Sequence, residues 1–140
     1  MLLGEFRHSL DSKGRVHIPA RWREELGSGV IVAQGLERCV FVFPRSRFDD
    51  LVEKLRSLSI ARKTNRDLSR LLYSSSSEEQ MDSQGRITIP PPLREWAALQ
   101  REVVLTGVMD RAEIWDRSSW GEYKTDRDQE YETIAEALEI

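Results

Sequence analysis

Apolar and polar residues alternate in two short segments near the start of the chain. Residues 6–10 read Phe-Arg-His-Ser-Leu, and residues 15–18 read Arg-Val-His-Ile. A period of two is typical of a β-strand with one buried face. The intervening Asp-Ser-Lys-Gly, residues 11–14, suits a turn, because Asp bonds downstream backbone N–H groups and Gly adopts positive φ. We therefore expect a β-hairpin that points Val16 and Ile18 into a core.

Longer spacings predict helices. Pro19 and Gly27 bracket Ala20–Leu26, which favours a short helix between them. Apolar residues also recur at the i, i+3, i+4, i+7 spacing of a helix, at 48, 51, 52 and 55 and again at 131, 134, 135 and 138. We expect the second of these stripes to form a packed helix. Further expected elements are strands at 30–32, 39–43, 86–89, 102–106 and 112–115, and helices at 64–73 and 93–98.

The chain contains an internal repeat. Asp11–Pro19 aligns with Asp82–Pro90, with six of nine positions identical, and Arg23-Glu24 aligns with Arg94-Glu95. Units of this size bury too little surface to be stable alone. We therefore expect an α+β fold in which a first repeat with a helical hairpin, residues 1–74, and a second repeat with a C-terminal helix, residues 75–140, share one pseudo-symmetric core.

Composition narrows the function classes. The 140 residues are 39% hydrophobic and 32% charged, typical of a globular domain, and no apolar run reaches the length of a membrane span. Cys39 is the single cysteine, which excludes an intramolecular disulfide and, with only two histidines, leaves little for a metal site. No secretory signal and no catalytic motif is evident. We expect a cytoplasmic protein that is not an enzyme and takes no cofactor or small-molecule substrate.

Net charge conceals an uneven distribution. The chain carries −3 overall, but residues 109–140 hold ten acids and four bases, so the remaining body is mildly basic. Strand alternation turns Arg15 and His17 outward in the first repeat and Arg86 outward in the second, and Lys13 projects from the first turn. An arginine on a rigid strand can donate two parallel bonds to guanine, and a two-stranded ribbon fits the major groove of DNA.

A structural role for the same motif is the alternative. Asp11 and Gly14, with Asp82 and Gly85, are the residue types that turn geometry requires. The following arginine then only forms a salt bridge to the turn aspartate. Turn geometry itself requires no guanidinium after the glycine, which favours a ligand-binding role for Arg15 and Arg86.

The segments 4–19 and 81–91 resemble the MraZ family of bacterial transcriptional regulators, of the AbrB-like (SpoVT-AbrB) class. The resemblance implies a swapped-hairpin β-barrel made from the two repeats, with flanking helices, and a ring-shaped homo-oligomer. It implies sequence-specific binding to direct repeats in promoter DNA, usually as a repressor of a cell division and cell wall operon, at the nucleoid. By this resemblance Arg15 and Arg86 would contact double-stranded DNA, with Lys13 in support. Because His17 shares the face of Arg15, we count it among the candidate DNA-binding residues as well.

Two other functions stay open. The chain could form a protein-interaction ring that binds an acidic partner without DNA, or an AbrB-like antitoxin whose acidic residues 126–140 block a toxin. A packed C-terminal helix and a doubled motif favour the DNA-binding regulator over the antitoxin, whose class usually carries one hairpin unit and a long disordered tail.

Overall fold

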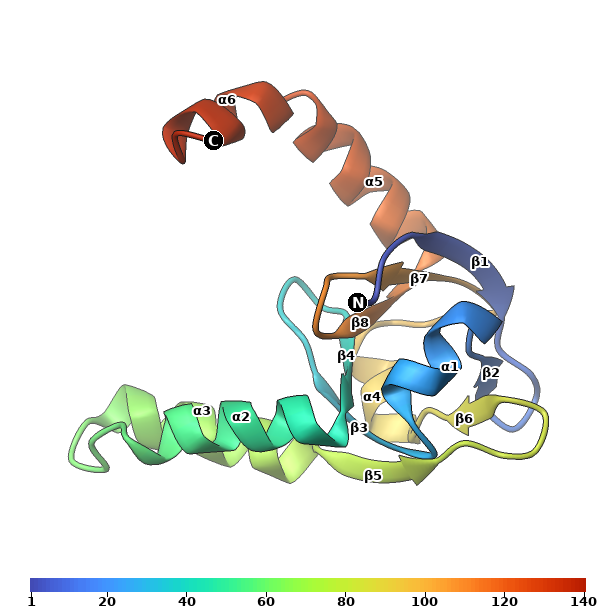
Figure 1. The fold of residues 1–140 in the computed structure, drawn as a ribbon, viewed down its shortest axis with the longest axis horizontal. Helices are drawn as coiled ribbons and strands as arrows, with labels where there is room; N and C mark the ends of the chain where they lie inside the picture. The colour runs from blue at the N-terminus through green and yellow to red at the C-terminus, as the bar shows by residue number, and fades with distance from the viewer.

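The computed structural model describes all residues from 1 to 140 as an α+β fold with eight strands and six helices (Figure 1). The strands are β1 (Glu5–Ser9), β2 (Arg15–His17), β3 (Gly29–Gln34), β4 (Val40–Pro44), β5 (Ser77–Gln80), β6 (Arg86–Thr88), β7 (Glu102–Gly107) and β8 (Ala112–Asp116). The helices are α1 (Ala20–Leu26), α2 (Arg45–Arg56), α3 (Lys63–Ser75), α4 (Pro91–Trp96), α5 (Arg117–Asp128) and α6 (Tyr131–Ala137). The helix expected between Pro19 and Gly27 is confirmed residue for residue.

Strands of the two repeats are interleaved in both sheets. All pairings are antiparallel, and the main sheet has the order β1-β7-β8-β4-β3-β5. The strands β2 and β6 form a separate two-stranded sheet. The first strand of each repeat, β1 or β5, therefore lies against a strand of the other repeat. All eight strands belong to these two sheets, and neither sheet closes into a barrel, so the expected swapped-hairpin β-barrel is not confirmed.

The expected hairpin between residues 6–10 and 15–18 is wrong. The turn closes through a bond from the Asp11 N–H to the Arg15 carbonyl, but beyond it β1 pairs with β7 and β2 pairs with β6. Alternation specifies which side chains face the core, and it is equally satisfied by either partner strand. Exchanging strands lets both repeats contribute to one larger core, which a lone repeat could not form.

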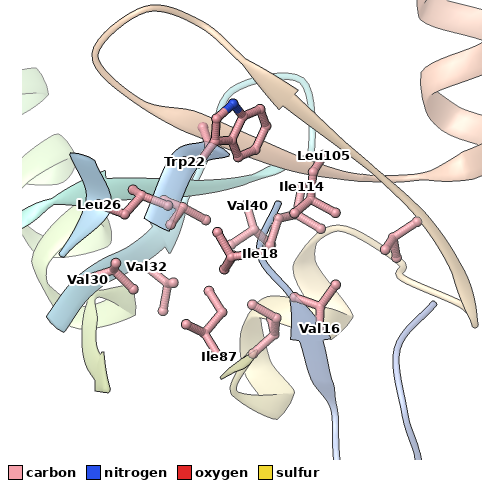
Figure 2. Packing of buried hydrophobic residues seen from close by; sticks show 14 of the residues in the cluster. Val16, Ile18, Trp22, Leu26, Val30, Val32, Val40, Ile87, Leu105 and Ile114 are labelled. Carbon is pink, nitrogen blue, oxygen red and sulfur yellow. The ribbon is translucent and has the colours of Figure 1, made fainter. Parts of the chain in front are cut away.

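The core is a cluster of 17 buried residues drawn from both repeats (Figure 2). Val16 and Ile18 of the first repeat and Ile87 and Ile89 of the second are at most 1% exposed, which confirms their expected inward direction. Trp22 of α1 is equally buried, and its indole N–H donates to the Leu3 carbonyl at 2.9 Å. Burial of each such side chain contributes about 1.5–3 kcal/mol, so the core fixes β2 and β6 from beneath.

Two helical arms project from this body. Figure 1 shows α2 and α3 extending as one pair and α5 and α6 as the other. Among them only Leu72 of α3 is buried. The expected packing of the C-terminal stripe is wrong, because Tyr131 is 72% exposed, Ile134 44% and Leu138 68%. Helical spacing specifies an apolar face but not a surface to cover it. None of the six helices has the length and apolar character needed to cross a membrane.

Candidate nucleic-acid interface

The turn before β2 is built around one aspartate. The Oδ1 atom of Asp11 accepts the backbone N–H groups of Lys13 and Arg15, both at 2.9 Å. Gly14 has φ +75° and donates its N–H to the Asp11 carbonyl at 3.0 Å. The aspartate therefore holds the backbone on both sides of the glycine, and the start of β2 leaves the turn in a fixed direction.

The turn before β6 repeats this geometry. The Oδ1 atom of Asp82 accepts the N–H groups of Gln84 and Arg86, again both at 2.9 Å. Gly85 has φ +76° and donates to the Asp82 carbonyl at 3.0 Å. Two turns with the same bonds thus deliver one arginine each at the first position of a strand.

The pairing of β2 with β6 brings the two arginines onto one face. In the antiparallel register Arg15 lies opposite Thr88, and His17 lies opposite Arg86. The residues between them, Val16 and Ile87, point into the core. The outward face is therefore a small composite surface, which we call the ribbon face and define as Arg15, His17, Arg86 and Thr88. Each repeat supplies half of it.

Each guanidinium is held by the aspartate of its own turn. The Nε atom of Arg15 donates to Asp11 Oδ2 at 2.7 Å, and that of Arg86 donates to Asp82 Oδ2 at 2.8 Å. In addition, Nη1 of Arg86 lies 3.9 Å from Asp11 Oδ2. The salt bridge weighed as the alternative role is thus present in both repeats, and the side chains of Arg15 and Arg86 are 29% and 19% exposed.

These ion pairs orient the arginines without using all their donors. A guanidinium has five N–H donors. The bond from Nε to a carboxylate leaves both Nη groups of Arg15 available, and Nη2 of Arg86, whose Nη1 also lies 3.9 Å from Asp11 Oδ2. The pairing also acts on the carboxylates. The backbone N–H of Arg15, followed by its side chain, lowers the pKa of Asp11 to about 2. The equivalent bonds from Arg86 lower the pKa of Asp82. Both aspartates are ionised at neutral pH, so each pair is close to neutral overall.

Two further arginines support the turns from the opposite repeat, and neither was assigned a role from the sequence. The guanidinium of Arg94 in α4 lies over Gly14, where a Cβ atom would come within 2.7 Å of its Cζ. The guanidinium of Arg23 in α1 lies over Gly85 in the same way, and its Nε donates to the Ile18 carbonyl at 3.0 Å. The alignment of Arg23 with Arg94 between repeats was the signal for this shared role.

The charge around the two turns is positive. Six basic side chains lie there against three acidic ones: Lys13, Arg15, Arg23, Arg86, Arg94 and Arg101 against Asp11, Asp82 and Glu95. Since Arg15 and Arg86 are paired with the two aspartates, the uncompensated charge comes from Lys13 and the other three arginines, offset in part by the one glutamate. Lys13 is exposed, as is its counterpart Gln84, which carries no charge.

The polar side chains of the chain form no candidate metal site. No three His, Cys, Asp or Glu side chains come together as a candidate metal site. Cys39 is buried, and burial raises the pKa of its thiol. A protonated thiol in the core is a weak nucleophile.

Comparison with known proteins places both repeats in one family. Residues 1–71 and 72–138 each match the family described as "MraZ protein, putative antitoxin-like". The chain is 45% identical over 138 residues to the transcriptional regulator MraZ of Natranaerobius thermophilus, covering 99% of this chain and 96% of the relative. The proteins of the same name from Halothermothrix orenii and Moorella thermoacetica are also 45% identical, over 139 and 138 residues, covering 99% of this chain and 97% and 96% of those relatives.

Proposed function

The chain belongs to the MraZ family, and from this premise we propose that it is a transcriptional regulator that binds promoter DNA sequence-specifically through its ribbon face. The expected target is a set of direct repeats upstream of a cell division and cell wall operon, which the protein represses at the nucleoid in the cytoplasm. The proposed activity is recognition of DNA and involves no catalysis.

The placement of Arg15 and Arg86 on one two-stranded ribbon carries this proposal. A ribbon of two strands is narrow enough to enter the major groove, where guanine presents O6 and N7 as a pair of acceptors. Fixing Nε on an aspartate removes freedom from the guanidinium before binding, which reduces the entropy lost on contact. The remaining Nη donors of each arginine are the groups we assign to base contacts.

Lys13 and His17 are assigned supporting roles. Lys13 is exposed at the tip of the first turn, where an ammonium group attracts a phosphate without reading sequence. His17 is exposed on the ribbon face opposite Arg86. Few uncompensated charges lie at this surface, so each copy should bind DNA modestly.

Assembly compensates for modest single-site affinity. We propose that the chain forms a ring-shaped homo-oligomer that presents several ribbon faces to successive DNA repeats. Linked sites can raise overall affinity by roughly 10²–10⁴ when their spacing matches the target. The exchange of β1 and β5 between residues 1–74 and 75–140 supports assigning these repeats to the AbrB-like swapped-hairpin class.

The test is a fluorescence-anisotropy titration of a duplex with direct repeats and of a scrambled duplex, at two salt concentrations. The double variant Arg15→Ala/Arg86→Ala should lose the preference for the repeat duplex. Arg15→Lys/Arg86→Lys should also lose it, while keeping the weak salt-dependent binding, because lysine keeps the charge but not the bidentate geometry. Arg47→Ala/Arg117→Ala removes two arginines from α2 and α5 and should bind like the native protein. Unchanged discrimination by the Arg15/Arg86 variants would refute the site.

An antitoxin-like function is the second candidate, and one observation favours it. The acidic C-terminal segment leaves its apolar side chains exposed, as a toxin-binding segment would. If the protein is an antitoxin, or a protein-interaction ring without DNA, the native chain and the Arg15→Ala/Arg86→Ala variant should bind the repeat duplex equally poorly.

A further inference from the structure

The outer face of the main sheet carries a row of polar residues. Glu5 of β1 lies opposite Thr106 of β7, which in turn lies opposite Glu113 of β8. Residues that face each other across antiparallel strands point to the same side of a sheet, with Cβ atoms about 4.5–5.5 Å apart. Because the chain neighbours Leu105 and Ile114 point into the core, this row points away from it. Two carboxylates therefore flank one hydroxyl group.

Aromatic side chains of β8 and α5 are bonded to this row. The ring centroids of Trp115 and Tyr123 are 5.0 Å apart, and those of Trp115 and Trp120 are 5.3 Å apart. The indole N–H of Trp120 donates to Glu5 Oε1 at 2.8 Å, and that of Trp115 donates to Glu113 Oε1 at 3.0 Å. Hydrogen bonds thus fix the position of the two indole rings relative to the carboxylates.

The polar row and the aromatic rings line one pocket of about 370 Å³, which we call the aromatic pocket. This volume is in the range of pockets that bind small molecules. The rest of the lining comes from Gly4, Glu37, Gly107, Val108 and Arg111. None of these residues belongs to the ribbon face or to the two turns, so the aromatic pocket is separate from the proposed DNA-binding surface.

The aromatic pocket has an excess of negative charge. Three carboxylates, those of Glu5, Glu37 and Glu113, line it against the single guanidinium of Arg111. Arg111 donates to Glu113 Oε2 from Nε at 3.1 Å and from Nη2 at 3.0 Å, which compensates that carboxylate. Neither Glu5 nor Glu37 forms an ion pair with a basic side chain. Lys124 lies near Glu5, but its ammonium group is bonded to a carboxylate of its own helix.

The hydroxyl group in the row has no partner. Thr106 is 5% exposed, and its Oγ1 atom is enclosed without a hydrogen bond. Folded proteins rarely leave a buried polar group unpaired, because its lost hydration is then not replaced. A donor that enters the aromatic pocket would supply the missing bond. Since the atom is enclosed, a lining side chain has to move aside to admit that donor, and exposed side chains such as Glu5 have the room to do so.

We propose that the aromatic pocket binds a small organic cation with an ammonium head, which it holds and does not transform. Uncompensated carboxylates attract positive charge, and aromatic faces both attract a cation and cover its alkyl chain. An ammonium group has three donors, for which Glu5, Glu37 and Thr106 offer acceptors. A metal ion is a poorer match, because no three metal-binding side chains gather here. The proposal does not rest on DNA binding.

The first experiment follows the four tryptophan indole N–H signals in TROSY spectra while the native protein is titrated with n-butylammonium chloride. Trp115 and Trp120 line the aromatic pocket, whereas the indoles of Trp22 and Trp96 bond to backbone carbonyls elsewhere and serve as internal references. The first two signals should shift saturably and the other two should stay. Neutral n-butanol, and sodium or magnesium chloride at matched ionic strength, should cause no such shift. Equal shifts of all four signals, or an equal effect of butanol or magnesium, would overturn the proposal.

A matched pair of variants tests the charge. Glu5→Gln keeps an acceptor for the Trp120 N–H and removes the negative charge, so the affinity for n-butylammonium should fall about tenfold or more. Glu102→Gln is the control, because Glu102 of β7 likewise accepts one side-chain bond, from the Ser9 hydroxyl at 3.3 Å, and does not line the pocket. It should bind like the native protein. Equal affinities of the two variants would count against the site.

Thr106→Val separates binding from folding. Loss of an unpaired buried hydroxyl should raise the urea midpoint, while the affinity for n-butylammonium falls about threefold to tenfold. A hydroxyl without a part in binding would change the midpoint alone, so an unchanged affinity would overturn the assignment of Thr106. These titrations contain no DNA, so their failure would leave the proposed function standing, and loss of DNA binding would leave the aromatic pocket standing.

Discussion

Replacing Gly85 by alanine probes how the second turn is supported from the first repeat. The residue has φ +76°, and a Cβ atom there would overlap the guanidinium of Arg23. Two other glycines provide references. Gly27 has φ +75° with open space around it, and Gly121 lies in α5 with open space and no positive φ.

The expected cost has two components. Alanine in the left-handed region costs about 1–2 kcal/mol. Gly27→Ala is a separate reference for backbone strain without overlap, because its ψ of −174° lies in a region used almost only by glycine, which costs of order 1–3 kcal/mol. In Gly85→Ala, Arg23 must also move and give up its bond from Nε to the Ile18 carbonyl, worth about 1.5–3 kcal/mol for a charged donor. Water recovers part of that loss because Arg23 is only half-buried, so we expect about 2–4 kcal/mol. Gly121→Ala should stabilise by about 0.5–1 kcal/mol.

Urea denaturation at one protein concentration measures the free energy of unfolding for this series. A second set in the Arg23→Ala background removes the overlap, and there Gly85→Ala should cost only the backbone strain of about 1–2 kcal/mol. Equal costs for Gly85→Ala in the native and Arg23→Ala backgrounds would refute the proposed overlap.

Two further predictions concern acid stability and salt. Hydrogen bonds in the folded chain lower the pKa of Asp11 to about 2, from about 3.9 in an unfolded chain. They therefore contribute stability that is present above pH 4 and is lost as the pH falls towards 2. The pKa of Asp82 is lowered in the same way. Urea midpoints should therefore fall more between pH 4 and 2 for the native chain than for Asp11→Asn/Asp82→Asn, and parallel curves would contradict this. Gln84→Lys copies Lys13 into the second turn and should tighten DNA binding, with a logarithmic salt slope steeper by about 1 per copy. Anisotropy titrations at several salt concentrations measure that slope, and no change would mean that this turn stays away from phosphate.

The local structure of each repeat follows from residues that are close together in the chain. Asp and Gly at fixed offsets specify the turn, Pro19 and Gly27 delimit α1, and alternation places Val16 in the core and Arg15 on the outer face. These features depend on backbone preferences and on the period of side chains along one element. They are therefore readable from residues that are neighbours in the chain.

The partners of these elements, in contrast, could be seen only in the folded chain. Alternation in residues 15–18 does not reveal that β2 pairs with β6, because a strand presents the same buried face to any neighbour. The packing of Arg23 over Gly85 joins residues 62 positions apart, and no local pattern encodes it. Helical spacing likewise predicted an apolar stripe around Ile134 but not its exposure, because whether a face is covered depends on what the rest of the chain brings to it.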